Sequence, residues 1–486
     1  MSISLKEQGI RAFLWDFAGK IALQGTGFII SIFLARLLEP SDFGTLAMVM
    51  VILGIAGIFS DVGLSGALVQ RRRVLPIHYN SVFFFNIAIA LILTIITFLS
   101  APFIADFYNN EKLLLLTQVI SVSFVLNALN TVHIAQFRKN LNYKVLTQIT
   151  LFSSVSSGLL GVLFAYFGFG IWSLVIQQLF SNILSVILVW YFSTWRPSLI
   201  FSFKALVQLW GFGFRMFLAA LLDGIFTRLD YIIIGKLFTP AILGFFQRAK
   251  SLDMLIVSYS SGSLMRVLFP LLSKVQNDLP RFRNIIVKSL GIICFVVFFL
   301  LGFFFLVSHE LIIILFTEKW ELSVEYFKIL VLSGFAYHIS ALLVNVLSSR
   351  GNSKAFLRLE IYKKIIFATN LLVGFIWGIK GYLYGLVIAS ALAVYLNIIF
   401  ASNEIGLLKW KLVKPIFIQS LIGIFSVCLV LLFNWVLFES NFLNFIMKGT
   451  EYLIFYMGLN FLLKTESYQY FIQQFPSLFK KVEKND

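Results

Sequence analysis

Long apolar stretches separated by short polar loops constrain the fold of this chain more than any other feature of its sequence. A helix needs about 20 consecutive apolar residues to cross the hydrocarbon core of a bilayer. A scan with a window of that length gives about fourteen candidate membrane helices, which predicts an all-α integral membrane protein. The expected helices cover residues 12–37, 43–68, 81–105, 113–136, 147–167, 170–192, 211–236, 242–271, 285–307, 324–348, 355–377, 381–401, 412–437 and 442–463.

The composition supports a membrane location. Of the 486 residues, 59% are hydrophobic and only 13% are charged, and a chain with this composition and a mean hydropathy of +0.92 would not stay soluble. The two cysteines, Cys294 and Cys428, lie inside apolar stretches, so we interpret them as packing residues rather than as a disulfide or a metal site. The N-terminus lacks the pattern of a signal-peptide cleavage site, and we expect the first apolar helix to be retained.

Lysine and arginine are concentrated in the loops that follow the even-numbered stretches, for example in residues 71–73 and 409–414, and in the C-terminal tail. The opposite loops carry mostly acids, such as Asp106 and Glu439. Because positively charged loops stay in the cytoplasm during insertion, this bias places both termini of a multi-pass membrane protein in the cytoplasm. The net charge of +17 is therefore mainly a topology signal, and we expect no nucleic-acid partner.

The sequence contains an internal repeat. Residues 35–44 resemble residues 235–244: a basic residue ends a helix, a proline interrupts it, and a glycine allows close approach early in the next helix. Residues 138–140 and 350–352 form a second matching pair. Because six helices separate equivalent positions, both halves would have the same orientation in the membrane.

The repeat predicts two parallel six-helix bundles around a central cavity, with two accessory C-terminal transmembrane helices outside the repeat. The expected division is an N-terminal six-helix bundle at residues 1–195, a cytoplasmic amphipathic linker at 196–210, a C-terminal six-helix bundle at 211–405, two accessory helices at 406–465 and a cytoplasmic tail at 466–486.

Charged side chains inside the apolar stretches are the candidate functional residues, because an ionisable group at bilayer depth is costly unless it faces protein or water. Cations outnumber acids there, which predicts a wet cavity suited to an anion such as a phosphate or diphosphate. The candidate substrate-binding residues are Lys20, Gln24, Arg215, Arg228, Arg248, Arg266, Arg358 and Lys364. The candidate ion-coupling or charge-balancing residues are Asp16, Asp61, Asp223, Asp230, Asp253 and Glu360.

Structural roles compete with this interpretation at several positions. Arg215, Arg266 and Arg358 lie near the expected cytoplasmic helix ends, where an anchor that reaches for the interface is as plausible as a ligand contact. Asp16 and Lys20 lie one helical turn apart and would serve equally well as a structural ion pair.

Two arginines are harder to explain as anchors. Arg228 and Arg248 lie deeper from either membrane face, and neighbouring acids would neutralise them or relay a proton. If residues 211–236 form one continuous helix, Asp223 and Asp230 share a face with Arg215, while Arg228 points elsewhere.

The chain carries no metalloprotease, serine hydrolase or nucleotide-binding motif, so we expect no enzymatic activity, no cofactor and no metal site. Any driving force would then come from an ion gradient, with H⁺ or Na⁺ as the coupling ion. Glu39 and Asp42 lie in the first outer loop, where membrane glycosyltransferases place a catalytic acid. We favour a simpler role, because Asp42 also stands where it caps the start of the next helix.

Several short motifs resemble a known family. They lie at residues 34–48 (LARLLEPSDFGTLAM), 61–70, 195–197, 230–236, 247–249 and 266–270. They are similar to signature segments of the Wzx/WzxC-like flippases, which are bacterial polysaccharide transporters, and the resemblance extends over about residues 5–410. One departure is Arg228, because many members of that family have a neutral polar residue there.

The resemblance implies the fold of the multidrug/oligosaccharidyl-lipid/polysaccharide exporters. It also implies a flippase that moves a polyprenyl-diphosphate-linked oligosaccharide, such as an O-antigen, capsule or exopolysaccharide repeat unit, to the outer leaflet by alternating access. The implied partners are membrane lipid, the lipid-linked glycan, and the glycosyltransferases and polymerase of the same pathway.

Two other functions stay open at this level. A multidrug or small-molecule antiporter of the same superfamily would need a net acidic cavity, whereas cations predominate here. A membrane-embedded polysaccharide polymerase or glycosyltransferase would carry catalytic side chains on a large outer loop, whereas the longest outer loop, about residues 308–323, is short. The glycines at 211, 213, 262 and 334 are candidate hinges, although glycine in membrane helices more often allows close packing.

Overall fold

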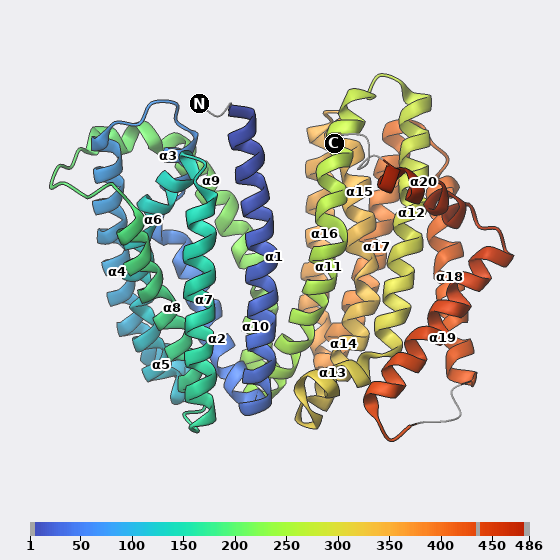
Figure 1. Ribbon diagram of the computed structural model, residues 1–486, viewed down its shortest axis with the longest axis horizontal. Coiled ribbons are helices and arrows are strands. Elements are labelled where there is room, and N and C mark those ends of the chain that lie inside the picture. The colour runs from blue at the N-terminus through green and yellow to red at the C-terminus, as the bar shows by residue number, and fades with distance from the viewer. Residues whose placement is uncertain (1–4, 434–437, 481–486) are drawn as a thin grey trace. The chain divides into compact units, whose positions relative to one another are not determined.

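The computed structural model of this protein describes residues 5–433 and 438–480, but not the side chains at 5, 6, 10, 257–267, 269 and 474–480. Every regular element within these residues is a helix (Figure 1). Eleven helical stretches in the described ranges are long and apolar enough to cross a membrane, which confirms the all-α membrane fold class. The number of about fourteen stays a prediction, because the apolar criterion joins residues 353–405 into one stretch and does not include residues 240–274 or 441–462.

Contacts between residues divide the chain into two compact units, Met1–Gly244 and Phe245–Asp486. In the first unit α7 lies between α1 and α8, α4 lies against α5 and α6, and α9 packs on α3 and α4. Its helices are α1 (Leu5–Leu37), α2 (Pro40–Ala56), the 3₁₀ helix η1 (Gly57–Ser60), α3 (Leu64–Gln70), α4 (Pro76–Tyr108), α5 (Lys112–Ser121), α6 (Ser123–Lys139), α7 (Tyr143–Tyr166), α8 (Ile171–Phe192), α9 (Phe203–Phe226) and α10 (Leu229–Leu237).

The helix α9 begins inside the segment expected as a linker. The Ser202 side chain caps this helix by accepting a hydrogen bond from the Ala205 amide (3.4 Å). The segment before it is tied to α4, because Asn80 donates to the Ser198 hydroxyl (2.6 Å) and the Ser202 amide donates to Ser81 (2.9 Å). These polar contacts explain why helix formation starts before the apolar stretch does. The expected division of the chain into bundles and a linker stays a prediction.

The two repeated motifs lie against each other within the first unit. Gly44, in the first turns of α2, faces the backbone of Pro240 and Gly244, and Gly244 faces the backbone of Pro40 and Gly44 in return. A Cβ atom at either glycine would overlap these backbone atoms. The glycines that the repeat predicted to allow close approach therefore do so, at a reciprocal crossing of α2 with the start of α11 (Pro240–Lys274).

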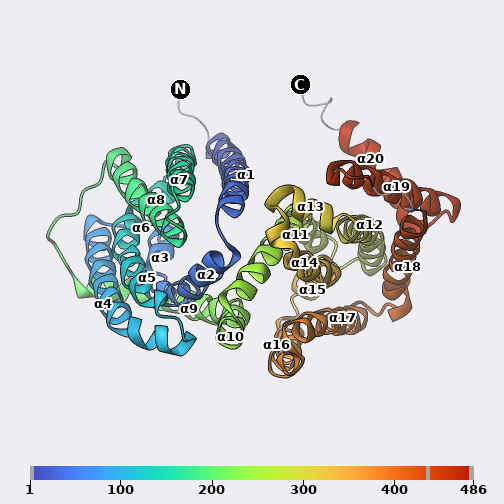
Figure 2. The ribbon, with the colours of Figure 1, turned by 90° about the horizontal axis from the view of Figure 1, so that it is seen from below.

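The second unit is built around α12, which contacts α14, α15, α18, α19 and α20 (Figure 2). Residues such as Leu290, Leu343 and Ile398 pack where α12, α15 and α17 meet. Besides the greater part of α11, its helices are α12 (Leu279–Leu306), α13 (Ser308–Phe316), η2 (Glu318–Trp320), α14 (Glu321–Ser333), α15 (Phe335–Ser349), α16 (Ser353–Val373), η3 (Gly374–Trp377), α17 (Gly378–Ile405), α18 (Lys409–Phe433), α19 (Asn441–Leu462) and α20 (Glu466–Lys480).

Both units contain the same cationic contact at equivalent places. In the first unit, Lys139 at the end of α6 donates to the carbonyl of Leu68 in α3 (3.0 Å). In the second unit, Arg350 after α15 donates to the carbonyl of Gln276 after α11 (2.6 Å). In each half of the repeat, a cation that follows the fourth expected helix donates to a backbone carbonyl at or just after the end of the second expected helix. This contact supports the internal repeat.

Candidate functional site

The charged residues predicted inside the membrane stretches have different partners in the structure, beginning with α1. Asp16 and Lys20 form an ion pair of 2.5 Å across one helical turn. The Lys20 side chain is 70% exposed. Gln24 is half-buried one turn further along. The structural pair that competed with a ligand role for these residues is thus present in α1.

Asp61 lies in a turn between η1 and α3. Its carboxylate accepts hydrogen bonds from the Ser65 amide (3.0 Å) and the Ser65 hydroxyl, and from the Asn86 amide group on α4 (3.1 Å). The carboxylate therefore caps α3 and joins it to α4. Because of this turn, the stretch 43–68 is two helical segments rather than the single expected helix.

The same turn explains one of the candidate hinge glycines. Val62 and Gly63 both adopt positive φ (46° and 73°), which is strained for valine and readily adopted by glycine. A Cβ at Gly63 would overlap the carbonyl of Gly213 in α9. Gly213 is thus a close-packing position between α3 and α9.

Arg228 lies at a break between α9 and α10. The Arg228 amide donates to the Ile225 carbonyl (3.0 Å), a tighter turn than that of an α-helix, so the continuous helix expected over 211–236 is wrong at this point. The guanidinium donates to the Gly224 carbonyl (3.2 Å) and lies against Gly54 of α2, where a Cβ would be 2.8 Å from Nε. Within the described residues Arg228 forms no ion pair, so no carboxylate neutralises its guanidinium.

The break also separates Asp230 from the face that Arg215 and Asp223 share on α9. Arg215 and Asp223 are exposed on α9, whereas Asp230 is buried in the first turn of α10. The Asp230 carboxylate accepts a hydrogen bond from the Tyr231 amide (2.9 Å). A uniform rotation of 100° per residue does not continue through a 3₁₀ turn, so the helical-wheel argument fails here.

Arg248 is 6% exposed in α11 and lies against aromatic rings. Its guanidinium carbon is 4.8 Å from the ring centroid of Phe316 and 5.1 Å from that of Trp320. These distances are typical of cation–π contacts, which stabilise a desolvated cation. Arg248 therefore joins α11 to α13 and η2, and its role as a ligand stays a prediction. On the same helix the Lys250 ammonium lies 5.4 Å from the Phe246 ring.

Asp253 and His338 line the same narrow apolar cavity, between α11, α12, α14 and α15. The His338 ring nitrogen Nδ1 is 3.2 Å from the Gly334 carbonyl. Gly334, another candidate hinge, stands where α14 ends, and a Cβ there would be 3.5 Å from Asp253 Oδ1. An acid and an imidazole beside one cavity can hold or pass a proton. Among the described residues, no three His, Cys, Asp or Glu side chains lie close enough together to hold a metal ion.

The remaining predicted residues lie on α16 or outside the described side chains. Arg358 and Lys364 are exposed along α16. Glu360 forms an ion pair with Lys363 (2.5 Å). The side chain of Arg266, and the position Gly262, fall within the part of α11 whose side chains are not described.

A buried ion pair joins α13 to α19, and neither of its residues is among the candidates that the sequence indicates. The sequence places Glu310 in the outer loop at about residues 308–323 and indicates no role for Lys448. In the structure the two side chains form an ion pair and are only 3% and 15% exposed, respectively. The sequence signal that could reveal this pair is Lys448 itself, the one lysine in the apolar stretch 442–463, because a lysine at bilayer depth needs a partner.

Comparison with known proteins gives a consistent result. Residues 33–325 match the protein family described as "Polysaccharide biosynthesis protein". The chain is 21% identical over 378 residues to the lipopolysaccharide biosynthesis protein WzxC of Escherichia coli (strain K12), which covers 76% of each chain. It is 24% identical over 409 residues to a membrane protein of the cps region of Klebsiella pneumoniae, covering 82% of this chain and 83% of that one.

A solved structure has the same fold. The inward closed conformation of the lipid II flippase MurJ matches with a TM-score of 0.71 at 15% sequence identity. The match covers 93% of this chain and 100% of the MurJ chain. It confirms the exporter-type fold that the sequence motifs implied.

Proposed function

Since this chain belongs to the polysaccharide biosynthesis protein family, we propose that it is a flippase that exports a polyprenyl-diphosphate-linked oligosaccharide across the bacterial inner membrane. The fold shared with a lipid II flippase and the similarity to a lipopolysaccharide biosynthesis protein support this class of substrate. A transport role also agrees with the lack of catalytic motifs in the sequence. Alternating access would carry the glycan from the cytoplasmic to the outer leaflet.

The single observation that carries the proposal is the environment of Arg228. Its guanidinium is half-buried at a helix break and, within the described residues, is not neutralised by a carboxylate. A cation held in this way in a membrane segment is costly unless it meets water or an anion. A diphosphate offers several oxygens to the planar guanidinium, and such charge-assisted hydrogen bonds are about twice as strong as neutral ones.

The experiment is an export assay in a strain that lacks its own flippase and carries this gene with its glycan pathway. We expect R228A to insert normally but to lower surface glycan about tenfold or more, because a hydrogen bond to a charged group contributes about 1.5–3 kcal/mol. The lipid-linked repeat unit should accumulate at the same time. R228K should retain part of the activity, because it keeps the charge but loses the planar donor arrangement.

The matched control is R72Q, which removes a cation from an exposed loop residue. R72Q should export normally. Normal export by R228A would refute the assigned site. Export of cationic drugs without any change in glycan would instead support the small-molecule antiporter.

The driving force is a further part of the proposal. The cavity beside Asp253 and His338 suits a proton better than Na⁺. Hard cations prefer several oxygen ligands, whereas the other side chains that line this cavity are apolar. Export should therefore fall when a protonophore collapses the proton gradient and should persist when Na⁺ is removed. The reverse result would assign the coupling to Na⁺.

A further inference from the structure

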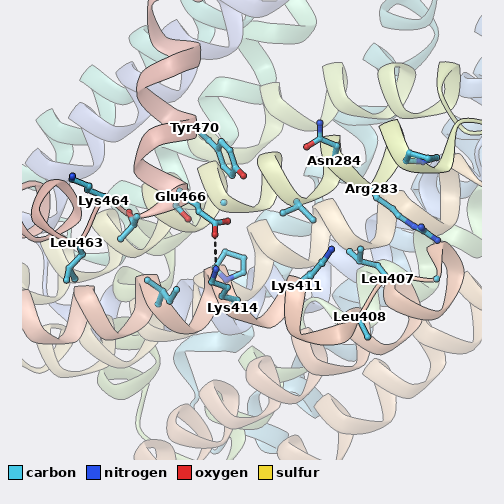
Figure 3. Close-up of a pocket in the computed structure, with 18 residues that line it drawn as sticks. Arg283, Asn284, Leu407, Leu408, Lys411, Lys414, Leu463, Lys464, Glu466 and Tyr470 are labelled. Carbon is cyan, nitrogen blue, oxygen red and sulfur yellow. Dashed lines mark hydrogen bonds and ion pairs between the residues drawn. The ribbon is translucent and has the colours of Figure 1, made fainter.

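A basic cavity of about 930 Å³ lies in the second unit, and none of the candidate functional residues discussed above lines it (Figure 3). Three segments line it: the start of α12, the α17–α18 connection with the first turns of α18, and the corner between α19 and α20. Its charged lining residues are Arg283, Lys411, Lys414, Lys464 and Glu466. Four cations and one acid give the cavity a net positive charge.

The contacts of these residues leave positive charge available. Glu466 pairs with Lys414 (2.7 Å), and Arg283 donates to the Ile405 carbonyl (2.6 Å). Figure 3 shows Lys414 and Lys411 on α18, with Glu466 reaching Lys414. In the part of the chain that the structure describes, Lys411 forms no ion pair, and neither does Lys464. An anion in the cavity would therefore meet cations that no protein carboxylate neutralises.

The walls of the cavity are held in place by a buried polar network. Tyr456 on α19 donates to Gln419 on α18 (2.7 Å), and Gln419 donates to Asn460 (2.8 Å). Thr465, at the corner before α20, also donates to Asn460 (2.6 Å). Tyr456, Gln419 and Asn460 are completely buried. Because a satisfied buried network is rigid, the corner that carries Lys464 is held in one position without a ligand.

The surroundings of the cavity resemble those of side chains at a membrane interface. All three lining segments belong to the positively charged loops expected on the cytoplasmic side. Leu408 and Trp410, next to the lysines of α18, are 73% and 61% exposed, and tryptophan is typical of the headgroup region. Leu407 and Ile418 add apolar surface to the lining. The cavity therefore combines a cationic wall with apolar surface at headgroup level.

We propose that this cavity binds the phosphate head group of an anionic membrane lipid on the cytoplasmic side. Basic pockets between membrane helices on this side suit such head groups, and the apolar lining suits the first part of the acyl chains. The accessory helices α18 and α19, which lie outside the repeat, would then have a function of their own as part of a lipid site. The proposal does not depend on the identity of the transported glycan.

The test is lipid binding to the purified full-length protein, measured by native mass spectrometry with phosphatidylglycerol and phosphatidylcholine. We expect the protein to bind phosphatidylglycerol more tightly than phosphatidylcholine. K411Q should weaken phosphatidylglycerol binding about fivefold, and K411Q with K464N about 25-fold, because each cation that lines the cavity and faces the head group contributes about that factor. Asparagine is chosen at 464 because that residue has positive φ (45°). K409Q is the matched control, since Lys409 is exposed on the same turn of α18 but does not line the cavity.

Three outcomes would overturn the proposal. The first is equal binding of the two lipids, and the second is a loss in K409Q as large as that in K411Q. The third is binding of inorganic phosphate that depends on the same lysines while phosphatidylglycerol does not bind, which would assign the cavity to a soluble anion. Lys411 is exposed on a helix surface, so K411Q decides alone if the double variant does not fold. R228A should bind phosphatidylglycerol normally, which separates this site from the export site.

Discussion

At the scale of single residues, each charge in a membrane segment has its own environment. The guanidinium of Arg248 lies on two aromatic rings, and the carboxylate of Asp61 caps a helix. Within the described residues, the Arg228 guanidinium donates a hydrogen bond to the Gly224 carbonyl and forms no ion pair. These differences separate two charges that stabilise the fold from Arg228, which we propose binds the substrate. Position along the chain does not make that distinction.

The Glu310–Lys448 pair provides a prediction at this scale. K448M should lower the free energy of unfolding by about 3–5 kcal/mol, because it leaves the Glu310 carboxylate buried without its cation. E310Q combined with K448M should recover most of that loss, since no uncompensated charge remains. The measurement is chemical unfolding in detergent micelles.

The control is K380M, which removes a cation from the exposed Glu325–Lys380 pair and should leave stability unchanged. Equal losses in K448M and in the double variant would show that the pair does not hold α19 to α13 by its charge.

At the scale of helices, interruptions and close crossings position the charges. The turn after α2 places the Asp61 carboxylate beside α4, and the break after α9 places Arg228 against α2. The first depends on Gly63 at positive φ. Both interruptions occur in segments, 43–68 and 211–236, that the apolar window predicts as single helices.

The reciprocal contact of Gly44 and Gly244 gives a prediction for helix packing. G44A should lower the free energy of unfolding by about 1–3 kcal/mol, because the added Cβ overlaps the Pro240 carbonyl and pushes α2 away from the start of α11. G27A is a matched control in α1, since nothing lies within 4 Å of a Cβ there. A thermal unfolding series would contradict the crossing if both variants lost equal stability.

At the scale of the whole molecule, the two units share a cationic contact at equivalent helix ends, and α18, α19 and α20 are the last helices of the second unit. That these helices are accessory to an internal repeat stays a prediction.

The positive loops predict the orientation of the entire chain. We expect a membrane-impermeant maleimide to label E111C in intact cells and R72C only after permeabilisation, in a chain whose two native cysteines are replaced by alanine. Labelling of R72C in intact cells would reverse the topology.

The sequence by itself determined the fold class, the position of most helices and the close-packing glycines of the repeat. The physical reason is that lipid demands long apolar helices and that a glycine beside a proline break has few other uses. Its motifs also determined the family, which the family match confirms.

Tertiary structure decided where the helices break and which charges are paired. The position of Arg228 against Gly54, the Glu310–Lys448 pair and the cavity around Lys411 all depend on contacts between residues far apart in the chain. A lysine that serves only as a topology signal and a lysine that lines a cavity have the same local sequence pattern. Only the folding of three loops to one place makes them different.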